Sequence, residues 1–112
     1  MQTSAIVTPK VSRSIGTSFV AVGGYTPAGS IGAIISGLVI ANTLGGLVNV
    51  TVTLYDGTND TNLMLARPCN GGDSIVLGGD IFKALLVNGW FIRVKSSIIG
   101  SLDASMFVVE VT

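Results

Sequence analysis

Apolar and polar side chains alternate along parts of the chain, and this period of two is typical of a half-buried β-strand. Residues 48–55 read VNVTVTLY, so Val52 points to one face of the strand and Thr53 to the other. Residues 91–95 read FIRVK and repeat the pattern, with Arg93 on the polar face. The predicted inward residues are Val50, Val52, Ile92 and Val94, and the predicted outward residues are Thr51, Thr53 and Arg93.

Turn signals rich in Gly, Pro, Asn and Asp separate these stretches at intervals of eight to twelve residues. Strands are expected near 17–22, 30–42, 47–55, 62–67, 73–77, 81–86, 90–95 and 106–112. Short strands at this spacing indicate an all-β fold, a single antiparallel β-sandwich or jelly-roll-like barrel of about eight strands.

The first thirteen residues are expected to lie outside this fold. They are largely polar and are interrupted by Pro9, so the prediction is an extended N-terminal arm at 1–13 and a β-sandwich domain at 14–112. Such a segment can add itself as a strand to the sheet edge of a neighbour. A disordered terminus is the equal alternative. The candidate interface residues in the arm are Ile6, Val7, Lys10 and Arg13.

Composition supports strands and points to a covered surface. Val, Ile and Thr number 14, 11 and 10, whereas Glu and Gln occur once each, and β-branched residues favour strands over helices. The stretch 14–55 contains no charged residue, and only 11% of the chain is charged, against about a quarter in typical domains. We therefore expect protein or lipid to cover much of the surface.

Lipid is the minority interpretation. The apolar part of 31–50 extends without a break for eleven residues, from Ile31 to Ala41. As a helix it would span about 16 Å, roughly half of a bilayer core. The nearest charges, Arg13 and Asp56, lie too far away to anchor it. The first ten residues also lack the basic start and apolar run of a secretory signal.

Chemistry-bearing residues are sparse. The chain has no histidine, one cysteine and a formal net charge of zero. We therefore expect no enzyme, no metal or other cofactor, no small-molecule substrate and no nucleic-acid partner. Residues 56–60 (DGTND) carry oxygen ligands at alternate positions, but Arg67 stands where a calcium loop needs Glu, so a hairpin tip is favoured.

Trp90 and Phe91 form the one aromatic pair in an apolar neighbourhood. Adjacent strand residues face opposite sides, so one of the two is expected in the core and the other outside, as an interface anchor or as a packing residue at the end of the fold. Both are candidate interface residues.

The order of turns and strands resembles that of small virion proteins of tailed bacteriophages. The matching segments are a Pro-Ala-Gly turn (25–29), a strand ending in Ala-Asn-Thr (38–43), the Val/Thr strand (48–55), a Leu-rich segment with an Asn-Gly turn (85–89) and Ile-Arg-Val (92–97). The resemblance covers roughly 17–112. Trp90 and Phe91 depart from it, because a polar pair usually follows the turn glycine.

The resemblance implies a structural protein on the capsid surface of a virion, assembled in the host cytoplasm. The expected function is that of a capsid cement, or decoration, protein, a homo-oligomer with the trimer as the expected form, bound to the major capsid protein. The alternatives are a tail, neck or fibre component and, from another class, a small membrane protein that uses 31–50.

Overall fold

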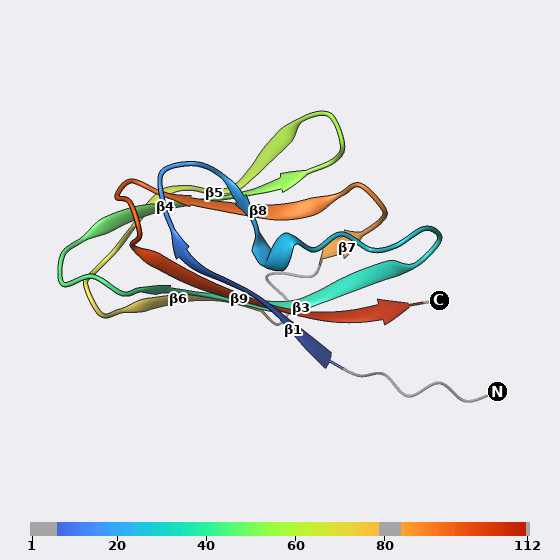
Figure 1. The fold of residues 1–112 in the computed structure, drawn as a ribbon, viewed down its shortest axis with the longest axis horizontal. Coiled ribbons are helices and arrows are strands. Elements are labelled where there is room, and N and C mark those ends of the chain that lie inside the picture. Colours follow the sequence, from blue (N-terminus) through green and yellow to red (C-terminus); the bar gives the residue numbers. More distant parts are fainter. Residues whose placement is uncertain (1–6, 79–83, 112) are drawn as a thin grey trace.

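The computed structural model of the chain describes residues 7–78 and 84–111, in which nine strands form two antiparallel sheets that face each other (Figure 1). The larger sheet has the order β1-β9-β3-β6, with β7 also paired to β3. Its strands are β1 (Val7–Ile15), β3 (Gly32–Asn42), β6 (Ser74–Gly78), β7 (Ala84–Leu86) and β9 (Leu102–Val111). The smaller sheet has the order β2-β8-β4-β5. Its strands are β2 (Val20–Ala21), β4 (Val48–Tyr55), β5 (Asp60–Cys69) and β8 (Phe91–Ser96), and one turn of 3-10 helix, η1 (Val22–Gly24), follows β2.

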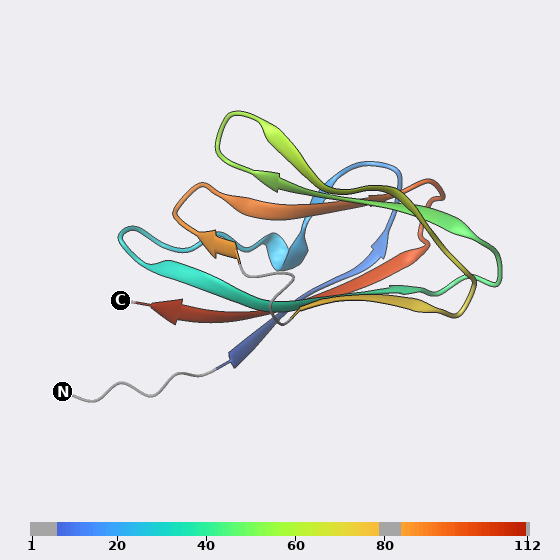
Figure 2. The same ribbon diagram turned by 180° about the vertical axis from the view of Figure 1, so that it is seen from behind.

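The predicted all-β sandwich is confirmed, as two open layers rather than a closed barrel (Figure 2). Strands β3, β4, β6 and β8 begin and end within two residues of their predicted limits. The segment expected at 17–22 is a strand only at Val20–Ala21, whereas β9 begins four residues earlier than expected. Of the strand expected at 81–86, residues 81–83 lie outside the described residues.

The core lies between the sheets, where the alternation places it. The four predicted inward residues on β4 and β8 have no exposed surface. They belong to one cluster with the inward residues of β3 and β9, which include Leu38, Ile40, Met106 and Val108. A slip of one residue in either layer would bring this apolar set to the surface, so the register is strongly determined.

The N-terminal segment differs from its prediction. β1 pairs with β9 from Val7 opposite Val109 to Ile15 opposite Leu102, so the predicted boundary between 13 and 14 falls inside a strand of the sandwich. Ile6 and the rest of 1–6 lie outside the described residues. The physical reason concerns Pro9: a proline is tolerated in an edge strand, which needs ladder hydrogen bonds on one side only.

The outward face of β4 also differs from its prediction. Thr51 and Thr53 point away from the core, yet they are only 6% and 1% exposed, and groups of β5 bond to both hydroxyls. Opposite 50–53 the β4–β5 register shifts twice, and Ala66 has a positive φ of 49°, so β5 departs here from a regular strand. The Thr53 hydroxyl donates to Asp60 Oδ1 at 2.9 Å, and the Thr51 hydroxyl accepts the N–H of Ala66 at 3.1 Å.

At one end of the sandwich, the β3–β4 and β5–β6 turns pack together. The buried Asn42 amide donates to the carbonyls of Gly46 and Cys69, at 2.8 and 3.0 Å. Beside it, Gly71 lies so close to Gly45 that a Cβ on Gly71 would stand 2.3 Å from the Gly45 carbonyl carbon. Cys69 is buried at the end of β5 rather than in a turn.

Candidate functional site

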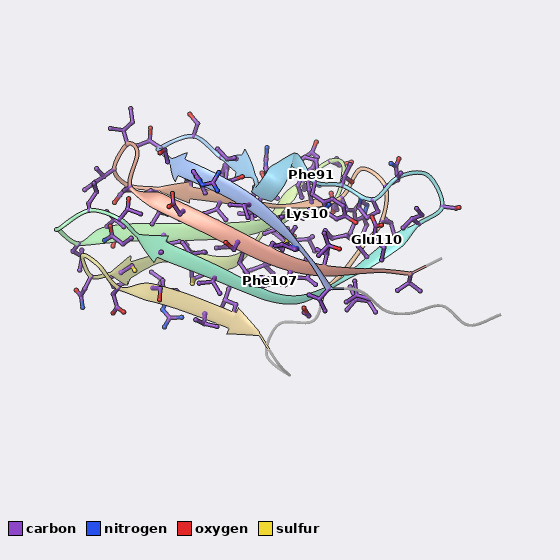
Figure 3. All side chains as sticks on the ribbon, turned by 60° about the horizontal axis from the view of Figure 1, so that its bottom comes forward. Lys10, Phe91, Phe107 and Glu110 are labelled. Atoms are coloured by element: carbon purple, nitrogen blue, oxygen red, sulfur yellow. The ribbon has the colours of Figure 1, made fainter. Side chains whose placement is uncertain are left out.

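The outer face of the five-stranded sheet is free of charge over three neighbouring cross-strand rows, and Arg13 and Asp103 lie beyond the third row. Its side chains form three cross-strand rows, which are Val7–Val109–Ile34, Pro9–Phe107–Gly37–Gly78 and Val11–Ser105–Val39–Val76. Five of them are exposed, with Val76 at 68% and Val7 at 53%. The rows contain no charged residue, and Figure 3 shows this side with Phe107 in its middle. We call these three rows the apolar face.

Two of the predicted interface residues lie at or beside this face. Val7 begins its first row, and Arg13 is exposed further along β1. Lys10 lies on the opposite side of β1, where it is half-buried and its ammonium stands 4.6 Å from the centroid of the Tyr25 ring. Ile6, as noted, is not among the described residues.

Tyr25 joins η1 to the end of β9. Its hydroxyl donates to Glu110 Oε2 at 2.7 Å. Lys10 and Glu110, which Figure 3 labels, belong to the paired strands β1 and β9. Burial and this bond to a carboxylate both raise the pKa of Tyr25 well above its ordinary value. Lys10 and Tyr25 therefore form an internal contact of this chain.

Trp90 and Phe91 face opposite sides of the smaller sheet, as predicted. Trp90 packs against the hydrophobic core. Phe91 lies on the outer face of β8, where its ring stacks on Tyr55 with 4.8 Å between the centroids. The interface role of both residues stays a prediction.

Beside this stack, Arg93 joins three aromatic rings to one carboxylate. Its guanidinium carbon lies 4.7 Å from the Tyr55 centroid, 5.0 Å from Phe19 and 5.8 Å from Phe91, all within cation–π range. Arg93 also forms an ion pair with Asp60, and its Nε donates to Asp60 Oδ1 at 3.1 Å. The hydrogen bond from Arg93 is the main reason that the pKa of Asp60 is lowered.

A hollow of about 740 Å³ adjoins this cluster on the same face. We call it the hydroxyl hollow. Its lining includes Asn49 and Thr51 of β4, Lys95 of β8, Ser97 directly after β8, Phe19 before β2 and Leu65 of β5. The irregular strand β5 pairs with β4 along one side of the hollow, and its Ala66 N–H bonds to the Thr51 hydroxyl. The volume is in the range of small-molecule and side-chain binding sites.

The β4–β5 connection, considered above as a calcium loop, is a hairpin tip. Asp56 Oδ1 accepts the N–H groups of Thr58 and Asn59, at 3.0 and 2.8 Å, and these bonds lower the pKa of Asp56. Within 7–78 and 84–111, no three His, Cys, Asp or Glu side chains are grouped to hold a metal ion. In the same residues, no helix is long and apolar enough to cross a membrane.

Comparison with known proteins gave no match to a family model, to a curated protein or to a solved structure.

Phe19, Tyr55 and Asp60 were not among the predicted site residues. Alternation does place Tyr55 and Arg93 on the outward faces of their strands. What it could not show is the β4–β8 register, which sets Tyr55 opposite Phe91 and Thr53 opposite Arg93. The pairing between distant strands is what assembles this cluster.

Proposed function

We propose that this chain is a structural virion protein, a capsid cement protein that stabilises a phage head. It binds the major capsid protein as a homo-oligomer, with a homotrimer as the expected form. The observation that carries the proposal is the apolar face, which is exposed and free of charge in a chain with no histidine. A protein with such a face acts by binding other protein surfaces through it.

The size of the apolar face suits a contact that is weak alone and strong in an assembly. Its five exposed side chains present a few hundred Å² of apolar surface, the size at which exposed patches mark interaction sites. This is less than one side of a standard protein–protein interface. In a symmetric oligomer that contacts several capsomers at once, such patches act together, and the combined affinity exceeds that of each patch.

The absence of charge on the apolar face favours packing against another apolar sheet face or a copy of the same face. Two such faces can approach to about 10 Å, the usual spacing of packed sheets, without burying an unpaired ion. A cement protein that binds the assembled shell, and does not bind free capsid subunits, stabilises the shell by mass action.

Copy number in purified particles tests the location. Quantitative mass spectrometry of the phage that encodes this chain should give a ratio to the major capsid protein near one. A few copies per particle would overturn the cement proposal in favour of a tail, neck or fibre component.

Substitution of Val76 tests the surface. Val76→Glu places a charge at the β6 end of the third row, and because Val76 is 68% exposed, the isolated domain should still fold. The variant should lose self-association in light scattering or attachment to heat-stressed particles. Ala28→Glu, in an exposed turn away from this face, is the matched control and should behave as wild type. Equal behaviour of both variants would show that the apolar face is not the contact.

A further inference from the structure

Two hydroxyl groups in the lining of the hydroxyl hollow have their oxygens occupied. The Thr51 hydroxyl oxygen already accepts the N–H of Ala66 at 3.1 Å. The Ser97 hydroxyl oxygen likewise accepts the N–H of Asn49 at 2.9 Å. A hydroxyl whose oxygen is occupied by a backbone donor still has its own hydrogen to donate. Both hydroxyls are therefore set to donate to a ligand.

The hollow also contains a cation without a carboxylate partner. The Lys95 ammonium lies 4.7 Å from the centroid of the Phe19 ring, and it forms no ion pair within the described residues. The one carboxylate that lines the hollow, Asp60, is held by Arg93 and by the Thr53 hydroxyl. Lys95 thus adds three N–H donors and one positive charge to the two hydroxyl donors.

An acceptor-rich, negatively charged group is the best partner for these three donor groups. A carboxylate accepts up to four hydrogen bonds and donates none, and bonds from an ammonium to a carboxylate are stronger than neutral ones. The hollow is several times larger than a carboxylate, so it has room for a whole acidic side chain and part of its main chain.

The exposed residues around the hydroxyl hollow indicate which type of molecule supplies the carboxylate. Leu65, which is 68% exposed, lines the hollow, and the stacked Tyr55–Phe91 pair lies beside Arg93 on the same face. Exposed apolar and aromatic groups around an arginine are typical of the residues that dominate protein–protein contacts.

We propose that the hydroxyl hollow binds an Asp or Glu side chain of a partner polypeptide, with Lys95, Thr51 and Ser97 as the donors. This inference rests on the proposed assembly function and extends it. The hollow lies on the outer face of one sheet and the apolar face on the outer face of the other. One copy can therefore contact two neighbours at once, one through apolar surface and one through a charged side chain.

A titration of the isolated, isotope-labelled chain by NMR tests the site. The probe is a blocked pentapeptide with glutamate at its centre, and its counterpart has glutamine there. We expect chemical-shift changes confined to the amides around Thr51, Lys95 and Ser97. The glutamine peptide should bind more weakly than the glutamate peptide, by a factor of up to about five. Lys95→Gln should weaken binding of the glutamate peptide by a similar factor.

Lys10→Gln is the matched control, because it removes the same charge from the other side of the molecule and should change the affinity less than twofold. Shift changes spread evenly over all cationic residues, or no change, would overturn the proposal. Tighter binding of glucuronate would assign the hollow to an acidic saccharide instead, and equal binding of inorganic phosphate would reduce it to an unspecific anion site. The titration uses the isolated chain and no phage particle. A negative result in it therefore leaves the copy-number test of the cement function unaffected.

Discussion

Thr53→Val should destabilise the protein, although Thr53 lies on the outward face of its strand. The substitution keeps the shape of the side chain and removes the hydroxyl that donates to Asp60 Oδ1 at 2.9 Å. At 1% exposure, water cannot reach the position to replace that donor on the Thr53 side.

The size of the stability loss follows from the charge on Asp60, the acceptor of the Thr53 hydrogen bond. Hydrogen bonds to charged groups contribute about 1.5–3 kcal/mol to stability. Asp60 retains its bond to Arg93 and part of its exposure to water. The free energy of unfolding should therefore fall by about 1–1.5 kcal/mol, at or just below the lower end of that range. For a chain of 112 residues, this corresponds to a fall in Tm of about 5 °C.

Urea unfolding followed by the fluorescence of Trp90, the one tryptophan in the chain, measures the change. Protein concentration must be held constant, since association shifts the apparent stability. The control is Thr61→Val, at an exposed position of β5, which should stay within about 0.5 kcal/mol of wild type. In an Asp60→Asn background the effect of Thr53→Val should shrink, because the charged acceptor is gone. Equal effects of Thr53→Val and Thr61→Val would refute the interpretation that the bond from Thr53 to Asp60 of β5 stabilises the fold.

Two further predictions concern the turns and the ion pair. Gly71→Ala should cost about 1–3 kcal/mol, because its Cβ would overlap the Gly45 backbone. Gly45→Ala, which has open space around its Cβ, should be nearly neutral in the same unfolding assay, and an equal cost at both sites would contradict the turn contact. Arg93→Met should be less stable than wild type at neutral pH, and the difference should narrow by about 1 kcal/mol below about pH 4. The direction of this pH dependence follows from the pKa of Asp60, which is lowered in the folded state. The stabilisation by the Asp60–Arg93 pair is present above the pKa that Asp60 has in the unfolded chain, and it disappears as the pH falls through the pKa of Asp60 in the folded protein. A difference that does not depend on pH would show that the ion pair adds nothing.

Local periodicity was sufficient to locate most strands and to assign their faces. In β4 and β8, each side chain is placed by the two-residue repeat alone, so Val52 and Ile92 could be assigned to the core without knowledge of any neighbour. Turn residues then separated the strands, because Gly, Asn and Asp accept the backbone conformations that turns require. The all-β class and the opposed orientations of Trp90 and Phe91 follow from the same local rules.

The tertiary structure alone decided which strands pair and what covers their outer faces. Pro9 suggested an arm, but β1 became an edge strand once β9 was available beside it. Alternation made Thr53 an outward residue, but in the fold it is buried beside Asp60 of β5 and opposite Arg93 of β8. The hydroxyl hollow brings together residues from before β2 and from β4, β5 and β8, which are far apart in sequence. These features depend on contacts between distant segments, whose register and curvature are set by the packing of the whole sandwich and leave no local periodic signal.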